Sequence, residues 1–320
     1  FPHNSIMIQT TVGGSLGETD DDLRWLVDYI QTNDPDGEGY YQAYTHIAPD
    51  ETIMEETDEE HFYQIGGATI FDNNGVKELQ MLWGEMDNHE GKMTRTGTCL
   101  AVYSLEGQPG NSTYLKRISK NEEFNTDDVG YGSTIWKDED GHIYLYVTEN
   151  NRPLVARTTT HDLTSEWEYY IRDLSGNFMW QKMYPTKEER TRSTIMENNY
   201  VCSMPQIFKK GDYYYMIGQA VSYGHSVYLY RGETPYGPFT DQKILFNVPY
   251  SVDKIGNQYY KNLLRVNLHL ELAREGELVF STNTDADTAG DNFDFPGSAD
   301  FCRPYFYRIF NWESIYDEDD

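Results

Sequence analysis

Short runs of β-branched and aromatic residues, separated by glycine and aspartate turns, recur along most of the chain. Such enrichment between turn residues is typical of antiparallel hairpins. The pattern is clearest from Cys202 to Phe246, where four strands in about 45 residues match the size of one β-propeller blade. The predicted strands of this stretch are Met204–Lys209, Tyr213–Gln219, Ser226–Arg231 and Gln242–Phe246.

The blade pattern repeats along the chain. The first strands of successive repeats are centred near Gly67, Gly132, Met204 and Leu268, which are 65, 72 and 64 residues apart. Together with the N-terminal fragment Phe1–Val12, the repeats predict an all-β chain in which residues 1–320 form one five-bladed β-propeller domain of four-stranded antiparallel blades. Phe1–Val12 either completes the last repeat, which shows three clear strands, or belongs to a first blade that is incomplete at the N-terminus. Closing the ring with an N-terminal strand would remove exposed sheet edges.

Composition narrows the classes of partner. The net charge is −28, with 53 acidic and 25 basic residues. Nucleic-acid binding needs a basic surface, and the same negative field disfavours anionic membranes and highly sulfated glycans. No apolar run reaches the length of a membrane span. The start at Phe1 rather than methionine, and the acidic, tyrosine-rich composition, favour a secreted or extracytoplasmic protein. The oligomeric state stays open.

Several phrases of the sequence resemble five-bladed propellers of glycoside hydrolase families 43 and 32, and related uncharacterised secreted propeller families. They are the hairpins QIFKKGDYYYMIGQA and STIWKDEDGHIYLYVTE, the segment PLVARTTTHDLTSEWEY and the connection RGETPYGPF. The resemblance covers roughly residues 66–310 and implies a carbohydrate substrate. Family 43 carries a catalytic aspartate early in its first blade, and Phe1–Val12 offers no counterpart. Either that segment is missing or the catalytic set differs here.

In a β-propeller the starts of the first strands and the ends of the second strands converge at one end of the central channel, which we call the mouth. Polar residues recur at these positions of the sequence. Glycoside hydrolysis needs two carboxyl groups, one a proton donor with a raised pKa and the other a base or nucleophile. The candidates for this catalytic pair are Glu85, Asp128, Glu149 and Glu271. Candidate substrate-binding residues are His269, Gln219, Asn283, Arg303, Tyr131 and Trp180. Residues at strand ends are often polar simply because they are exposed to solvent. A purely structural role therefore stays open for each of these candidates.

Two of these assignments carry a local expectation. His269 and Glu271, two residues apart, are expected on one face of a strand, where they would contact each other. Trp180 is expected in a long insert between blades, residues 173–199, where inserts often shape a substrate site.

No cofactor is required by this chemistry, and one metal site is conceivable. Asp285, Asp287 and Asp291 present hard oxygen ligands at short spacing, as calcium loops do. The segment lacks an oxygen side chain at the fifth position and a closing glutamate, so a solvated acidic loop is the preferred interpretation. The sequence therefore predicts a glycoside hydrolase acting on a poly- or oligosaccharide. The alternatives are a non-catalytic glycan-binding propeller and a polysaccharide lyase.

Overall fold

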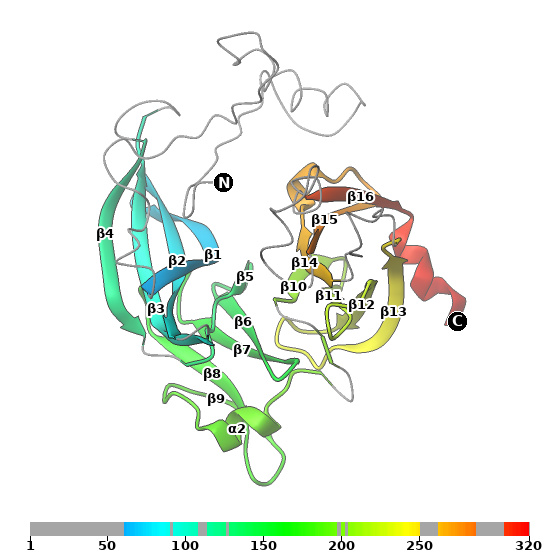
Figure 1. The fold of residues 1–320 in the computed structure, drawn as a ribbon, viewed down its shortest axis with the longest axis horizontal. Coiled ribbons are helices and arrows are strands. Elements are labelled where there is room, and N and C mark those ends of the chain that lie inside the picture. The colour runs from blue at the N-terminus through cyan, green and yellow to red at the C-terminus, as the bar shows by residue number, and fades with distance from the viewer. Residues whose placement is uncertain are drawn as a thin grey trace. The chain divides into compact units, whose positions relative to one another are not determined.

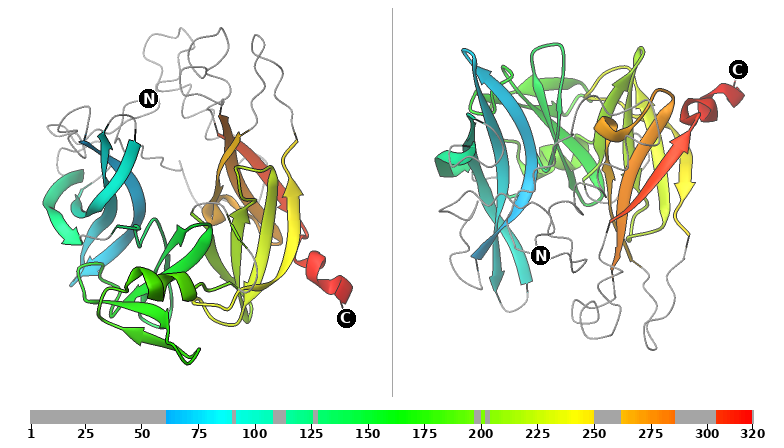
Figure 2. Two further views of the ribbon diagram at one scale, coloured as in Figure 1. Left: turned by 60° about the horizontal axis from the view of Figure 1, so that its bottom comes forward. Right: turned by 90° about the horizontal axis from the view of Figure 1, so that it is seen from above.

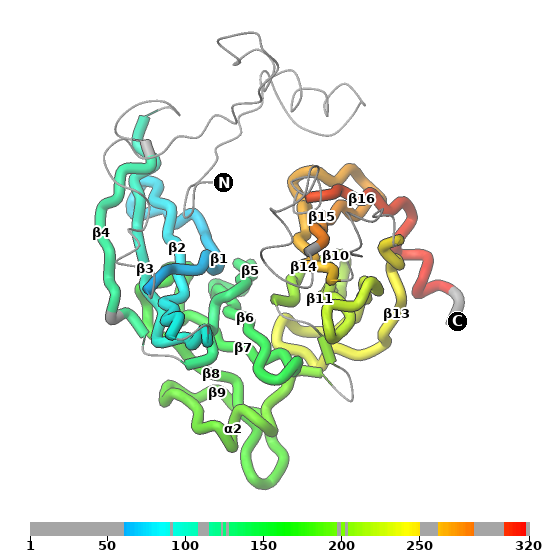
Figure 3. The backbone as a smooth tube through the Cα atoms, in the orientation of Figure 1, coloured from blue at the N-terminus to red at the C-terminus, as the bar shows by residue number. Residues whose placement is uncertain are grey.

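The computed structural model describes residues 61–89, 92–107, 114–125, 128–196, 200–201, 204–249, 262–285 and 304–319. The chain divides into two compact units, one of residues 1–133 and 162–164 and the other of residues 134–161 and 165–320. Phe1–Val12, and with it the predicted fifth blade, lies outside the described residues. Figure 1 labels the strands and helices of both units, and Figure 3 traces their backbone.

The described residues of the first unit form one antiparallel sheet with strand order β1-β2-β3-β4. Asn74 and Gly75 join β1 to β2 with φ values of 54° and 89°, as in the type I′ hairpin turns that an Asn-Gly pair favours. The strands are β1 (His61–Asn73), β2 (Val76–His89), β3 (Lys92–Leu105) and β4 (Tyr114–Asn125).

The hydrophobic pattern predicts a strand over Thr113–Ile118, and β4 is longer than that. Its continuation, residues 119–125, is almost entirely polar, yet Ser119 and Asn121 pair with Val102 and Leu100 of β3. A strand at the edge of a sheet tolerates polar residues on the side that meets water. Hydrophobic patterning therefore underestimated this strand.

The second unit begins with a five-stranded antiparallel sheet, ordered β5-β6-β7-β8-β9. Its last strand and the short helix α2 occupy the segment that the sequence predicts to be an insert. Thr186 caps α2 with a capping box, in which its side chain accepts from the Glu189 amide and Glu189 reaches back to the Thr186 amide. The elements are β5 (Thr134–Lys137), β6 (Ile143–Glu149), β7 (Arg152–Thr158), β8 (Trp167–Arg172), β9 (Phe178–Gln181) and α2 (Lys187–Arg192).

Two further antiparallel sheets complete the second unit, one of four strands and one of three. The three sheets of the second unit adjoin one another, with β10 beside β5 and β14 beside β11. Figure 2 shows the three sheets in succession. The elements are β10 (Gln206–Lys210), β11 (Tyr213–Gln219), β12 (Ser226–Gly232), β13 (Thr240–Asn247), β14 (Asn262–Leu268), η1 (Leu270–Leu272), β15 (Glu277–Asp285), β16 (Tyr305–Phe310) and η4 (Trp312–Asp319).

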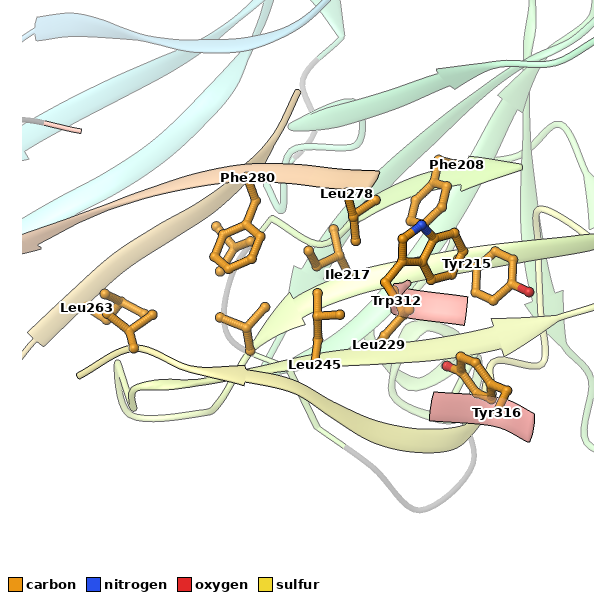
Figure 4. Close-up of a cluster of buried hydrophobic side chains, with 13 residues drawn as sticks. Phe208, Tyr215, Ile217, Leu229, Leu245, Leu263, Leu278, Phe280, Trp312 and Tyr316 are labelled. Atoms are coloured by element: carbon orange, nitrogen blue, oxygen red, sulfur yellow. The ribbon is translucent and has the colours of Figure 1, made fainter. Parts of the chain in front are cut away.

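The C-terminal helix η4 adds aromatic contacts to the core. Figure 4 shows Trp312 beside Phe208 and Tyr215, with ring centroids 5.4 and 4.9 Å away. Trp312 is 3% exposed, and Tyr316, one turn further on, is also buried against this cluster. Aromatic side chains bury large areas, so η4 seals the core between the last two sheets.

The predicted fold class, all-β with the antiparallel sheets of a β-propeller, is confirmed. Four sheets are present among the described residues, where the sequence predicts five blades. Three of them begin where the repeats place the first strands, since β1 contains Gly67, β5 follows Gly132 and β10 follows Met204.

Candidate functional site

Two glutamates of the first unit, Glu85 on β2 and Glu122 on β4, have contrasting surroundings. Glu85, on β2, is half-buried and is in register with Tyr63 on β1 and Gly97 on β3. A Cβ atom at position 97 would lie 2.8 Å from Glu85 Oε2. Because glycine has no side chain, Gly97 leaves room for the Glu85 carboxyl to extend over β3.

Glu122, on β4, is held by two donors. Its Oε1 atom accepts a hydrogen bond from the Tyr63 hydroxyl at 2.8 Å and lies 2.6 Å from Lys120 Nζ. Lys120 also lies over the Tyr63 ring, 4.9 Å from its centroid. The hydrogen bonds from Lys120 and Tyr63 lower the pKa of Glu122. Glu122 is therefore ionised at neutral pH.

The pKa of Glu85 shifts in the opposite direction. Burial raises this pKa, and the negative charge of Glu122 raises it further, against the smaller opposing effects of Lys120 and Arg95. Glu85 Oε1 is buried and has no hydrogen-bond partner among the described residues. A buried carboxylate oxygen without a donor favours the protonated acid, because the charge would be uncompensated.

This arrangement places on one sheet a carboxyl group whose pKa is raised and another whose pKa is lowered. Two carboxyl groups whose pKa values are pushed apart can serve as proton donor and as base or nucleophile. Cys99, buried on β3, does not compete as a nucleophile, because burial raises the pKa of its thiol to about 12. Sequence reasoning included Glu85 but missed Glu122, which lies beyond the predicted end of its strand.

The other predicted catalytic residues have different surroundings. Asp128 is exposed at a bend that follows β4 in the first unit. Glu149, at the end of β6 in the second unit, forms a two-point ion pair with Arg190 of α2. Arg190 Nε and Nη2 lie 3.0 and 3.1 Å from its two carboxylate oxygens. The side chains of Arg190 and Glu149 are 4% and 18% exposed, so this pair fastens α2 to the sheet. A catalytic role for either carboxylate stays a prediction.

His269 and Glu271 do not share a strand, and that prediction is wrong. β14 ends at Leu268, and the chain turns into η1 through a bond from the Leu272 amide to the His269 carbonyl. The predicted contact is nevertheless present, with His269 Nδ1 3.3 Å from Glu271 Oε1. His269 Nε2 lies 2.8 Å from Ser281 Oγ. The bond to His269 lowers the pKa of Glu271, whose side chain is 67% exposed.

The predicted substrate-binding residues are spread over both units. Gln219 is 2% exposed, and its amide donates to the carbonyls of Gly224 and Leu263. Tyr131 is 1% exposed in the first unit, and Asn283 lies opposite Leu264 in β15. Arg303, Asp287, Asp291 and the side chain of Asp285 lie outside the described residues. Their assignments stay predictions.

The described part of the chain shows no cluster of three or more histidine, cysteine or acidic side chains that could bind a metal ion. Its helices are all too short or too polar to cross a bilayer.

Trp180 lies on β9 within a group of aromatic rings. Its ring centroid is 4.7 Å from that of Tyr170 and 5.5 Å from that of Tyr236, and the Arg157 guanidinium lies 4.1 Å from it. Tyr170 and Tyr236 also line a pocket of about 600 Å³ in the second unit. The other lining residues are Arg152, Arg172, Phe178, Thr194, Ile195, Met196, Tyr200 and Pro238.

Comparison with known proteins adds one close relative. A crystal structure of a candidate hydrolase from Bacteroides ovatus is 53% identical to this chain, with a TM-score of 0.80 over 99% of this chain and 78% of that one. Two further solved structures are distantly similar. An α-L-arabinanase from Cellvibrio cellulosa is 13% identical, with a TM-score of 0.38 over 76% of this chain and 72% of that one. A glycoside hydrolase family 43 protein from Bacillus licheniformis is 12% identical, with a TM-score of 0.37 over 78% of this chain and 43% of that one. No curated protein matches the chain. The family described as a domain of unknown function, DUF5005, matches residues 1–312, and the chain belongs to that family.

Proposed function

We propose that this protein is a glycoside hydrolase that cleaves a poly- or oligosaccharide with two carboxyl groups, Glu85 and Glu122. The observation that carries the proposal is the opposite direction of their pKa shifts on one sheet, caused by burial at Glu85 and by two donors at Glu122. The description of the Bacteroides ovatus relative as a candidate hydrolase supports the same reaction class.

In this mechanism Glu85 is the proton donor. It transfers its proton to the glycosidic oxygen as the bond to the anomeric carbon breaks, which leaves Glu85 ionised and the sugar as an oxocarbenium-like centre. Glu122, held by Tyr63 and Lys120, either removes a proton from the attacking water or bonds to the anomeric carbon. In the second case a water deprotonated by Glu85 later releases the sugar.

The test is hydrolysis of a polysaccharide panel by the purified protein, with new reducing ends and product masses as the readout. General acid or base catalysis contributes about 10²–10⁴ in rate, so Glu85→Gln and Glu122→Gln should each lose at least about a hundredfold. Glu78→Gln is the matched control, because Glu78 lies on the same strand and, among the described residues, its carboxylate accepts one hydrogen bond, from Asn73 Nδ2 at 3.5 Å. Full rates in both test variants, with melting temperatures like that of the wild type, would refute the assignment.

A second candidate function, glycan binding without cleavage, is favoured by the aromatic pocket of the second unit. Saturable binding of a glycan from which no product is released would support it. Release of an unsaturated product that absorbs in the ultraviolet would instead identify a polysaccharide lyase.

A further inference from the structure

The pocket of the second unit is built from several separate stretches of chain. Arg152 begins β7, while Tyr170, Arg172 and Phe178 lie at the adjoining ends of β8 and β9. The remaining walls come from Thr194–Met196, from Tyr200 and from the connection between β12 and β13. A volume of about 600 Å³ lies within the usual range of pockets that enclose small ligands.

The aromatic walls of this pocket are ordered by stacking. The rings of Tyr170 and Phe178 lie 4.9 Å apart and within 15° of parallel. Tyr236 meets Tyr170 edge-on at 5.0 Å. Phe178 and Tyr200 remain 39% and 48% exposed. The Arg172 and Arg152 guanidinium groups lie 5.6 and 5.4 Å from the centroids of these two rings, so each arginine lines the pocket together with an aromatic side chain. Aromatic rings of this kind offer an apolar face to a sugar, and tyrosine adds a polar tip.

The two arginines of the pocket differ from others in the same unit. Arg157, Arg190, Arg231 and Arg308 each pair with a carboxylate. In the described part of the chain, neither Arg152 nor Arg172 forms an ion pair. Arg152 donates to the Thr191 carbonyl and the Tyr200 hydroxyl, both at 3.2 Å, and Arg172 Nε donates to the Gly176 carbonyl at 3.0 Å.

These bonds leave guanidinium N–H groups of both arginines available. None of the ten described lining residues is acidic, in a chain whose net charge is −28. The charge of the whole chain acts weakly inside the pocket, because salt screens exposed charges beyond about 8 Å at physiological ionic strength. Two guanidinium groups that form no ion pair with any described residue, beside aromatic side chains, favour a ligand that carries both an anionic group and an apolar face.

We propose that this pocket binds an acidic sugar residue, whose carboxylate is held by Arg152 and Arg172 and whose ring packs on the aromatic walls. Guanidinium groups bind carboxylates with paired, charge-assisted hydrogen bonds. The inference goes beyond the proposed hydrolysis, because it requires no catalytic role for Glu85 or Glu122. It also assigns a use to residues that sequence reasoning did not select.

Ligand-observed NMR and calorimetric titration test the proposal. The probes are D-glucuronate, D-galacturonate and trigalacturonate, each compared with the neutral sugar that carries a hydroxymethyl group in place of the carboxylate. We expect at least one acidic probe to bind at millimolar concentration or below, its neutral counterpart to bind about tenfold more weakly or not at all, and added salt to weaken the binding.

Two variants locate the binding. Arg152→Gln and Arg172→Gln should each lower the affinity for the acidic probe about tenfold or more. Arg172→Lys should bind more tightly than Arg172→Gln but less tightly than the wild type, because lysine lacks the planar guanidinium. Lys210→Gln is the charge-matched control at the exposed end of β10, where Lys210 lies 3.9 Å from Glu313, and should bind as the wild type does. Melting temperatures show whether each variant is folded.

Three results would overturn the proposal. The first is equal affinity for the acidic and neutral probes, or no binding of any probe. The second is full affinity in both arginine-to-glutamine variants. The third is binding of inorganic sulfate as tightly as the acidic sugars, which would identify a plain anion site without a role for the sugar ring.

Discussion

Replacing Glu149 with glutamine would separate a structural from a catalytic role for this carboxylate. Glu149 and Arg190 meet through two nitrogen–oxygen contacts of 3.0 and 3.1 Å, and Arg190 is almost fully buried. Removing one partner of a buried ion pair costs about 3–5 kcal/mol, because the other charge stays buried and uncompensated. Glutamine keeps one acceptor oxygen, and Arg190 keeps its bond to the Pro185 carbonyl. We therefore expect Glu149→Gln to lower the free energy of unfolding by about 3 kcal/mol, the lower end of this range.

Thermal unfolding measures this loss. For a unit of this size each kcal/mol lowers Tm by about 2–4 °C, so Glu149→Gln should melt about 6–12 °C below the wild type. Glu168→Gln is the matched control. Its partner Arg157 also donates twice, at 2.9 and 2.7 Å, but the two side chains are 21% and 20% exposed, so the loss should be about 1 kcal/mol or less.

The double variant Glu149→Gln/Arg190→Met removes both charges and should be more stable than Glu149→Gln alone. An unchanged melting temperature in Glu149→Gln would refute the reasoning from burial. If glycan hydrolysis were lost at the same time, Glu149 would take part in the chemistry, as the sequence predicts.

Three further predictions concern the proposed catalytic pair and the core. The rate of hydrolysis should fall as pH rises through the raised pKa of Glu85, because Glu85 then loses its proton. The rate should also fall as pH decreases through the lowered pKa of Glu122, because Glu122 then becomes protonated. The pH–rate profile of Glu85→Gln should lack the fall in rate at alkaline pH. Gly97→Ala should lower the rate, because the new Cβ displaces the mobile end of the Glu85 side chain, and should also lower Tm, because the same atom would lie 3.1 Å from the backbone carbonyl oxygen of Asn125. A rate equal to that of the wild type would contradict this. Trp312→Ala should lower the free energy of unfolding, measured by urea denaturation, by about 3–5 kcal/mol. Phe310→Ala is the control: this side chain is 66% exposed, so its removal should change the free energy of unfolding by about 0.5 kcal/mol or less.

The pH dependence of stability follows from the same shifts. The lowered pKa of Glu122 contributes stability that is complete above its unfolded value near 4.5 and is lost as pH falls through the folded pKa. The raised pKa of Glu85 acts in the other direction. Its contribution is complete below the unfolded value and is lost as pH rises through the folded pKa.

Strands and turns were predictable because their signals are local. The Asn74-Gly75 and Lys210-Gly211-Asp212 turns, with positive φ at both glycines, are determined by residues adjacent in sequence. The repeat of first strands near Gly67, Gly132 and Met204 follows from the same short-range patterns. Strand β9 was missed because it has only four residues and gains its stability from pairing with β8.

The candidate site was predictable only in its residue types. The sequence selected Glu85 among several carboxylates but could not identify Glu122 as its neighbour. The donor that holds Glu122, Tyr63, is 59 residues away along the chain. The pocket arginines gave no signal either, because an arginine is recognised as unpaired only when the positions of the acidic residues are known.

The sequence by itself determined an all-β chain of repeated antiparallel sheets, since hydrophobic alternation and turn residues act over a few positions. Tertiary structure alone decided which carboxyl group is buried, which is ionised and which is neutralised by an arginine. Glu149 and Glu85 look alike in sequence, each near the end of a second strand. Arg190, 41 residues further along, pairs with the first, while burial beside Glu122 raises the pKa of the second. Charge, burial and hydrogen bonding act through space, so the chemistry of each carboxylate depends on contacts that folding creates.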